Sequence, residues 1–408
     1  MATSFPLEKI NFLLLENIHR TAREAIEGEG FHLECLSGAL GEEELLARIP
    51  EVHVLGIRSK TRVTARVLAE ARRLISVGCF CIGTNQVDLQ AANRRGVPVF
   101  NAPFSNTRSV AELIVAEIIA LSRQLGDRSR EMHEGRWRKG SSAGSREVRG
   151  KTLGIVGYGH IGSQVGVLAE ALGMQVIFFD TGSKLAMGNN RRCDSLGELL
   201  GAADFVTLHV PATPQTKEMI GARELAAMGK GAFLLNASRG SVVVLPALAE
   251  ALRGGHLGGA AVDVYPEEPE SDRDGFATPL RGLPNVILTP HVAGSTGEAQ
   301  AAIGREVAGS LIKLMNAGAT TGAVNFPQVE LPPVAGSHRI LNAHRNVPGV
   351  LRDINRIVSE RNANIRSQVL ATDPDIGYLI MDLDQDVSDE VKTAIAALPT
   401  SIKTRILY

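Results

Sequence analysis

A glycine-rich turn near the middle of the chain constrains the fold more than any other feature. The run LGIVGYGHIG occupies residues 153–162. In a turn from a strand into a helix, Gly157 would permit the sharp bend, Gly159 would let the backbone approach a pyrophosphate, and Gly162 would let the helix pack closely on its strand. Glycine-rich turns are common, so this motif is weak by itself and its surroundings decide its meaning.

The segments around the turn have the order that a dinucleotide-binding unit requires. Residues 152–156 read as a buried strand, residues 163–172 as a helix, and MQVIFFD as a second strand that ends at Asp180. The free N–H groups at the helix start favour a pyrophosphate, and the acid can accept hydrogen bonds from a ribose diol. A carboxylate there repels a 2′-phosphate, so we expect NAD. Basic residues that follow closely keep NADP open as an alternative: Lys184, Arg191 and Arg192.

Size and charge exclude several classes of function. A chain of 408 residues is too long for one ordinary core and indicates about two to four domains. Its 43 basic and 44 acidic residues are nearly balanced and form no basic block, so we expect no nucleic-acid or membrane partner. The apolar run FLLL near the N-terminus is too short for a signal peptide or a membrane span, which favours a cytoplasmic protein.

The cysteines predict neither disulfides nor a metal site. Cys35, Cys79, Cys81 and Cys193 show no C-x-x-C spacing. Cys79 and Cys81 are alternate residues, too close for a comfortable disulfide. We therefore expect reduced thiols and no metal.

Strand and helix patterns alternate through most of the chain. Before the glycine turn, NFLLLE, VHVLGIRS, LISVGC and VPVFNA read as strands, and residues 20–28, 64–73 and 109–123 read as helices, the last with Thr107 or Ser109 as its cap. After it, DFVTLHV, GAFLLNAS, LGGAAVDVY and VILTPH read as strands. Such alternation predicts α/β architecture with two doubly wound, Rossmann-like parallel sheets.

The last seventy residues have a different order. A Pro-rich stretch over residues 325–337 reads as a linker. Beyond it, strands at 339–346, 363–372, 377–384 and 401–408 and helices at 348–362 and 388–399 give the order β-α-β-β-α-β, which predicts a ferredoxin-like unit. No catalytic constellation falls there, so a binding or regulatory role is the simpler interpretation.

Three charged residues follow strands beyond the glycine motif. Arg239 follows the strand GAFLLNAS and Glu268 follows LGGAAVDVY. His291 comes directly after VILTP, at the end of the last strand. Ligands of doubly wound sheets bind at the carboxyl ends of the strands, so we expect the three to converge there. A guanidinium can bind a carboxylate and polarise a carbonyl, an imidazole can exchange a hydroxyl proton, and a carboxylate can fix the imidazole tautomer. Together they would suit hydride transfer between a nicotinamide and a hydroxy acid.

Each of these residues also has an ordinary structural interpretation. A lone His after a Pro is more often a loop residue, Glu268 falls in the acidic loop PEEPESDRD, and Arg239 could cap a helix. Spacing alone does not decide between these interpretations.

The motifs resemble those of a known family. GYGHIG with Asp180, HVPATPQT at 209–216, NASRGSVV at 236–243, DVYPEEP at 263–269 and TPHVAGST at 289–296 are similar to the ordered signatures of NAD-dependent D-isomer-specific 2-hydroxyacid dehydrogenases. GCFCIGTNQVD at 78–88, NAPFSNTRSVAE at 101–112 and the C-terminal module resemble three-domain bacterial members. The resemblance implies oxidation of 3-phospho-D-glycerate to 3-phosphohydroxypyruvate, which begins serine synthesis.

The resemblance also implies roles for individual residues. Arg239 would bind substrate, His291 would be the acid/base and Glu268 its carboxylate partner. NAD would be bound by Gly157, Gly159, His160, Ile161, Gly162, Asp180, His209, Pro211, Ala237, Ser238, Arg239, Asp263, His291 and Gly294. The substrate would contact Ser59, Lys60, a turn around Gly78, Asn106, Arg239 and His291. Lys60 stands where close relatives commonly have Arg, which keeps the charge but loses bidentate phosphate geometry.

The C-terminal module resembles an ACT domain. The resemblance implies that L-serine binds between paired domains and inhibits, through His344, Asn346 and Asn364. Asn346 could instead be an ordinary helix cap before Pro348. The expected hinge has Ser337 after Gly336, where two glycines are frequent, so its backbone has less freedom for a swinging motion.

These expectations give a domain plan. Residues 1–106 and 296–330 would form a substrate-binding domain, 107–295 the NAD-binding domain, 331–337 a linker and 338–408 the ACT domain. A homo-oligomer, by family inference a tetramer, is expected. The alternatives are a dehydrogenase for another 2-hydroxy acid, such as 2-hydroxyglutarate, and a non-catalytic NAD-sensing binding protein.

Overall fold

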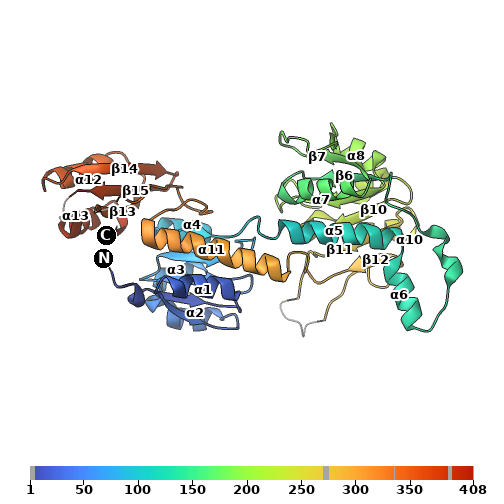
Figure 1. Ribbon diagram of the computed structural model, residues 1–408, viewed down its shortest axis with the longest axis horizontal. Helices are drawn as coiled ribbons and strands as arrows, with labels where there is room; N and C mark the ends of the chain where they lie inside the picture. Colours follow the sequence, from blue (N-terminus) through green and yellow to red (C-terminus); the bar gives the residue numbers. More distant parts are fainter. Residues whose placement is uncertain (1–4, 270–274, 335, 385–387, 408) are drawn as a thin grey trace. The chain divides into compact units, whose positions relative to one another are not determined.

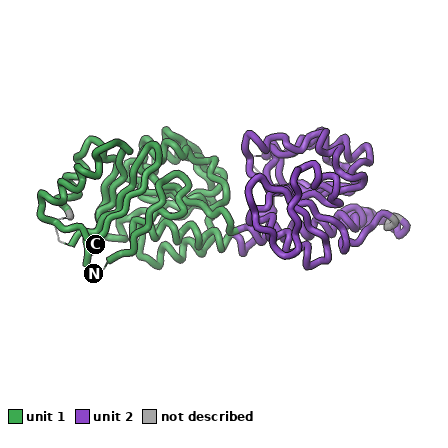
Figure 2. Tube along the Cα trace, turned by 90° about the horizontal axis from the view of Figure 1, so that it is seen from above, with its two compact units in different colours: residues 1–105, 300–408 green, residues 106–299 purple. Residues whose placement is uncertain are grey.

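The chain divides into two compact units. A computed structural model describes residues 5–269, 275–334, 336–384 and 388–407, with backbone alone at 141–143 and 388. Unit 1 comprises Met1–Ser105 and Gln300–Tyr408, and unit 2 comprises Asn106–Ala299 (Figure 2). Each unit contains a parallel sheet, and unit 1 also contains an antiparallel one, which confirms the predicted fold class.

Unit 1 begins with a five-stranded parallel sheet in the order β2-β1-β3-β4-β5. Figure 1 labels the four helices α1 to α4 that belong to it. The order places its switch point between β1 and β3, where connections leave in opposite directions. The elements are β1 (Asn11–Leu14), α1 (Arg20–Gly28), β2 (His32–Cys35), α2 (Glu42–Arg48), β3 (Val54–Ile57), α3 (Ala65–Glu70), β4 (Ser76–Cys79), α4 (Leu89–Arg94) and β5 (Val99–Phe100).

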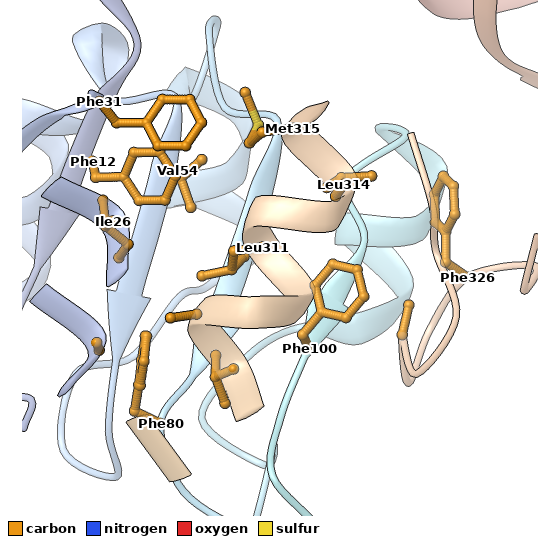
Figure 3. Close-up of a cluster of buried hydrophobic side chains, with 14 of the residues drawn as sticks. Phe12, Ile26, Phe31, Val54, Phe80, Phe100, Leu311, Leu314, Met315 and Phe326 are labelled. Atoms are coloured by element: carbon orange, nitrogen blue, oxygen red, sulfur yellow. The ribbon is translucent and has the colours of Figure 1, made fainter. Parts of the chain in front are cut away.

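One face of this sheet is covered by a helix from much later in the chain. α11 (Gly297–Ala317) contributes Leu311, Leu314 and Met315 to the buried cluster that Figure 3 shows around Phe12 and Phe100. Gly78 of β4 permits this packing, because a Cβ there would lie 2.8 Å from Leu311 Cδ1. The return of the chain therefore closes the core that the first hundred residues begin.

The C-terminal part of unit 1 is a four-stranded antiparallel sheet in the order β14-β15-β13-β16. The observed order β-α-β-β-α-β agrees with the predicted ferredoxin-like arrangement. Its elements are β13 (His338–Arg345), α12 (Val350–Ser359), β14 (Ile365–Thr372), β15 (Ile376–Leu383), α13 (Ser388–Ala396) and β16 (Ser401–Leu407).

A buried ion pair ties this sheet to the segment that precedes it. Arg339 donates to both carboxylate oxygens of Asp382, at 2.7 and 2.8 Å, and its side chain is 5% exposed. The same guanidinium donates to the backbone carbonyls of Ala317, Leu331 and Pro332. Such a pair is tolerated in the interior because its hydrogen-bonding capacity is used.

The expected linker is only partly free of the core. Phe326 and Val329 are 7% and 3% exposed, and the Asn325 side chain bonds to the backbone of Val97 and Val99. The segment is therefore anchored at its start. Ser337 caps its own turn by donating to Val334 O at 2.7 Å.

Unit 2 is built on a seven-stranded parallel sheet in the order β12-β11-β10-β9-β6-β7-β8. Its elements are α5 (Thr107–Ser122), α6 (Leu125–His133), β6 (Thr152–Val156), α7 (His160–Ala171), β7 (Gln175–Phe179), β8 (Arg191–Arg192), α8 (Leu196–Ala202), β9 (Phe205–Leu208), α9 (Ala222–Ala227), β10 (Phe233–Asn236), α10 (Leu245–Arg253), β11 (Gly259–Val262) and β12 (Val286–Leu288).

The start of α5 differs from the prediction. Asn106, rather than Thr107 or Ser109, holds the N-cap position, and no side-chain hydrogen bond caps the helix. Ser109 instead bonds to Thr296 Oγ1 at 2.7 Å, so its hydroxyl joins α5 to the segment before α11. In the described part of the chain, no helix is both long and apolar enough to span a bilayer.

Candidate active site

The glycine turn lies at the switch point of the unit 2 sheet. β6 is flanked by β7 on one side and β9 on the other, and the chain reaches them in opposite directions. The N–H of His209, just after β9, donates to Val156 O at the end of β6, at 2.7 Å. The ends of these two strands therefore lie together where doubly wound sheets bind ligands.

The three glycines of the motif fit the roles predicted for them. Gly157 has φ of 90°, and a Cβ on it would lie 2.4 Å from His209 O. A Cβ on Gly162 would lie 2.2 Å from Gly157 O, so the helix packs against the turn. A Cβ on Gly159 would meet no atom within 4 Å, which leaves open space at the start of α7. These residues fit a pyrophosphate at the helix N-terminus, where His160 and Ile161 begin the helix.

Asp180 lies immediately after β7, beside this turn. Its Oδ2 accepts a hydrogen bond from Tyr158 N and its Oδ1 from Gly182 N, both at 2.8 Å. The carboxylate is thus fixed next to the glycines with lone pairs left for a diol. Arg192 donates to Asp180 O at 3.3 Å, and among the described residues no ion pair joins the two side chains.

The loop after β10 is shaped by a residue that the sequence did not single out. Asn236 is 1% exposed; its Oδ1 accepts from Ser238 N and Oγ, and its Nδ2 donates to Arg239 O at 3.1 Å. A Cβ on Gly240 would lie 1.9 Å from the backbone of Tyr265, so this loop touches the loop after β11. Arg239 is exposed, and no described carboxylate pairs with it, so it can receive an anion.

Asp263 holds together the loops after β11 and β12. It is 1% exposed, and its carboxylate accepts hydrogen bonds from Thr289 Oγ1 at 2.6 Å, Val292 N at 2.8 Å and Ala293 N at 3.0 Å. Its backbone carbonyl accepts from His291 N at 2.8 Å. Hydrogen bonds to an ionised acceptor are about twice as strong as neutral ones, so the loop around His291 is firmly set.

His291 and Glu268, the two residues predicted to manage the proton, are hydrogen-bonded to each other. Their Nδ1 and Oε2 atoms are 2.8 Å apart, and the side chains are 53% and 36% exposed. Glu268 Oε1 also accepts from Tyr265 N at 3.1 Å, which orients the carboxylate. His291 has φ of 54°, an uncommon backbone state that Asp263 stabilises. With Nδ1 engaged by Glu268, Nε2 is left to face a substrate.

Other residues predicted for the cofactor lie at the same edge of the sheet. Burial lowers the pKa of His209 to about 3, so this imidazole is neutral and bonds to Thr207 Oγ1. Thr216 Oγ1 donates to Pro211 O at 2.6 Å, which fixes the loop after β9. A Cβ on Gly294 would lie 2.3 Å from Asn106 Nδ2, so the Asn106 side chain closely approaches this glycine. Ala237 follows β10 directly.

Glu117, inside α5, is a buried acid that the sequence did not reveal. Burial, and then the negative charge of Asp263, raise its pKa from 4.5 to about 8. The unfolded chain releases this proton above pH 4.5 but the folded chain keeps it to about 8, so stability falls as pH rises between these values. At pH 7 the cost is on the order of 3 kcal/mol, at about 1.4 kcal/mol per pH unit.

In unit 1, the residues predicted to bind substrate follow β3 at the switch point of that sheet. Glu16, 8% exposed, accepts hydrogen bonds from the N–H groups of Arg58, Lys60 and Thr61 at 2.9–3.2 Å. It thereby shapes the loop that presents Ser59 and Lys60. Gly78 lies inside β4, paired with Gly56 and Phe100, so it belongs to the strand predicted over LISVGC and not to a turn.

The predicted effector residues are only partly brought together. His344 is 3% exposed on β13, burial lowers its pKa, and its Nδ1 bonds to Asn342 Oδ1. Asn346 is no helix cap, since α12 has Gly349 at that position; its Nδ2 donates to Asp373 O at 2.7 Å. The N–H of Asn364 donates to Asp384 Oδ1. Asp384 follows Leu383, and Leu383 pairs with His338 at the start of β13, whereas His344 lies near the end of that strand. One copy therefore presents Asn364 and Asn346 at opposite ends of this strand.

Comparisons with family models match two parts of the chain. Residues 115–293 match the D-isomer specific 2-hydroxyacid dehydrogenase, NAD binding domain. Residues 340–403 match the AHAS small subunit-like ACT domain. The first range contains the glycine turn and the Arg239, Glu268 and His291 set, and the second coincides with most of the antiparallel sheet.

Similar proteins extend over the whole chain. The D-3-phosphoglycerate dehydrogenase of Dictyostelium discoideum is 57% identical over 406 residues, covering 100% of this chain and 99% of the relative. The enzyme of that name from Escherichia coli K12 is 50% identical over 408 residues, with 99% of each covered. Among solved structures, the TT0316 protein of Thermus thermophilus is 32% identical with a TM-score of 0.68, covering 75% of this chain and 97% of that one.

Replacing Asp180 should alter the preference between cofactors. Asp180→Ala removes a charged acceptor for a ribose diol, so NAD affinity should fall about 10- to 100-fold, as expected for a lost hydrogen bond to a charged group. Affinity for NADP should fall less or rise. Fluorescence titration with the reduced cofactors measures both, and the exposed Asp194→Ala is the control. An unchanged NADH to NADPH ratio would show that Asp180 does not read the ribose.

Proposed function

Because the chain belongs to the D-3-phosphoglycerate dehydrogenase family, we propose that it oxidises 3-phospho-D-glycerate to 3-phosphohydroxypyruvate with NAD as its cofactor. The observation that carries the proposal is the His291–Glu268 pair, 2.8 Å apart, at the carboxyl edge of the sheet that holds the glycine turn. This pair serves proton transfer, which a purely NAD-sensing protein would not need. The Glu268 carboxylate contacts both Nδ1 of His291 and the N–H of Tyr265. These two contacts support a role for His291 as a positioned base.

The reaction needs three tasks from the chain's own residues. Arg239 binds the substrate carboxylate and polarises the carbon–oxygen bond that changes. His291 takes the hydroxyl proton at Nε2 during oxidation and returns it during reduction. Glu268 accepts the hydrogen bond from Nδ1–H, which keeps Nε2 unprotonated before oxidation and stabilises the imidazolium that forms. When bound, NAD supplies the acceptor for the hydride.

We assign the domains accordingly. Residues 1–106 and 296–330 form the substrate-binding domain, 107–295 the NAD-binding domain and 338–408 the ACT domain, joined by a linker at 331–337. Ser59 and Lys60 bind the phosphate from the loop that Glu16 shapes. Lys60 attracts it as a point charge, because an ammonium lacks the planar fork of Arg.

We also propose feedback inhibition by L-serine in a homo-oligomer, with the enzyme in the cytoplasm. The opposite placement of Asn346 and Asn364 in one copy supports a site made by two ACT domains, with His344 and Asn346 from one copy and Asn364 from the other. Paired ACT domains together with paired dehydrogenase domains would form a tetramer. Contacts from the side-chain amides of Asn346 and Asn364 to the bound serine would then hold two copies together.

Removing the imidazole tests the catalytic assignment. His291→Asn should lower kcat for NADH-dependent reduction of 3-phosphohydroxypyruvate by about 10²- to 10⁴-fold, the usual contribution of a general acid–base, while NADH binding is retained. Stopped-flow and fluorescence titration measure the two quantities. The exposed His32→Asn serves as control and should keep full activity. Equal turnover by wild type and His291→Asn would remove His291 from the mechanism.

Removing the effector contact tests the regulatory assignment. Asn346→Ala deletes a hydrogen-bonding amide, so the serine concentration for half inhibition should rise about tenfold or more, with uninhibited turnover unchanged. Initial rates at increasing serine measure this. Asn355→Ala, on α12 of the same domain, is the control. If Asn346→Ala and Asn355→Ala responded to serine alike, the effector site would lie elsewhere.

A further inference from the structure

One residue of the motif at 78–88 makes a buried contact that the reaction as described so far does not use. Gln86 is 5% exposed, and its Nε2 donates hydrogen bonds to Arg58 O at 2.6 Å and to Gly83 O at 3.3 Å. Arg58 directly follows β3 and begins the loop of residues 58–62, which carries the predicted phosphate contacts. Gln86 therefore holds the start of this loop by its backbone carbonyl.

Backbone hydrogen bonds join the other end of the 58–62 loop to the same motif. Val63 N donates to Gln86 O at 2.8 Å, and Asp88 N donates to Val63 O at 2.9 Å. These two bonds make a parallel bridge between Val63 and Val87, which are 0% and 6% exposed. The loop is therefore fixed to the motif at both of its ends.

The carboxylate of Glu16 holds the inner side of the loop. Glu16 comes shortly after β1 and is 8% exposed. Its Oε1 accepts hydrogen bonds from Arg58 N and Thr61 N, and its Oε2 accepts one from Lys60 N. These bonds turn three N–H groups of the loop inward, while Ser59 and Lys60 are exposed. A loop held in this way is ordered before any substrate binds.

The loop carries positive charge that no described carboxylate neutralises. Its sequence RSKTR contains Arg58, Lys60 and Arg62, and in the described part of the chain none of the three forms an ion pair. By contrast, Arg48 and Arg66 of the same unit pair with carboxylates at 2.6 and 2.5 Å. A phosphate monoester, with a charge of about −1.5 to −2 at pH 7, suits such a loop better than an uncharged hydroxyl group does.

We propose that Gln86 and Glu16 are positioning residues that set the preference for a phosphorylated over an unphosphorylated 2-oxo acid. By fixing the backbone of the 58–62 loop, they place Ser59 and Lys60 where the phosphate binds. The proposal rests on the proposed role of Ser59 and Lys60. Without Gln86 and Glu16, the Arg58 carbonyl and three N–H groups would lose their partners, and binding would have to order the loop at a cost in affinity.

A purely structural role would have a different signature in the kinetics. Gln86, Glu16 and the 58–62 loop lie in unit 1, whereas the glycine turn and His291 lie in unit 2. A loosened loop should therefore weaken binding of the phosphate group without changing NADH affinity or proton transfer at His291. General damage to the fold would instead lower the turnover of every substrate.

Steady-state kinetics with two substrates test this inference. Gln86→Leu removes the donor to Arg58 O, and Glu16→Gln replaces the carboxylate with an amide that accepts hydrogen bonds at only one of its two ends. In each variant, KM for 3-phosphohydroxypyruvate should rise about 10- to 100-fold, as for lost hydrogen bonds to a charged group. The kcat with this substrate, the NADH affinity and kcat/KM for hydroxypyruvate should each stay within about threefold of wild type.

A control variant and a double variant separate positioning from other effects. Glu44 also accepts a backbone N–H in unit 1, from Gly41 at 2.9 Å, but this bond caps α2, so Glu44→Gln should leave the preference between the two substrates unchanged. Lys60→Ala removes a phosphate contact itself. In that background, Gln86→Leu should lower the remaining preference by less than about threefold, because residues that act through one another are not additive.

The melting temperature and NADH affinity of each variant report whether it folds. Gln86→Leu and Glu16→Gln change contacts to different backbone atoms of the loop, so either one that folds decides the result. An unchanged preference in a folded variant would overturn the proposal, as would an equal loss with both substrates or a fully additive loss in the Lys60→Ala background. A wild-type chain without any preference for 3-phosphohydroxypyruvate would instead contradict the proposed function, and with it the phosphate role of this loop.

Discussion

The carboxylate of Asp263 is the interaction on which the site of unit 2 depends. Asp263 directly follows β11, and its carboxylate accepts hydrogen bonds from Thr289, Val292 and Ala293, all of which follow β12. These contacts hold His291 in a left-handed backbone conformation with Nδ1 against Glu268. Without a buried acceptor at this point, three donors would lose their partner and the loop that carries His291 would lose the contacts that fix it.

Sheet topology explains why residues distant in sequence meet here. The carboxyl ends of parallel strands share one edge, so loops after β6, β7, β9, β10, β11 and β12 gather there. Close backbone contacts then lock neighbouring loops together, as Gly157 does against His209 and Gly240 against Tyr265. Polar side chains of the loops complete the arrangement, since Asn236 and Asp263 satisfy backbone groups that would otherwise be buried without partners.

Much of this architecture follows from local sequence, because strand and helix periods, glycine turns and strand-end charges are local properties. They predicted the fold class, and the resemblance to a family assigned roles to Arg239, Glu268 and His291. Long-range contacts are not encoded locally. Nothing near Glu16, Asn236 or Glu117 marks them as buried polar residues, because each acquires its environment from strands elsewhere in the chain. The close packing of Gly78 against α11 is not visible locally either, because α11 lies far later in the sequence.

In the proposed reaction, Arg239, His291 and Glu268 act on a phosphorylated 2-oxo acid with NADH. The most direct measurement is the rate of NADH oxidation by the wild-type chain with 3-phosphohydroxypyruvate, compared with unphosphorylated hydroxypyruvate and with 2-oxoglutarate. We expect the highest kcat/KM for 3-phosphohydroxypyruvate, because Lys60 can bind its phosphate group, which the other two substrates lack. NADH binding without oxidation on 3-phosphohydroxypyruvate would contradict it.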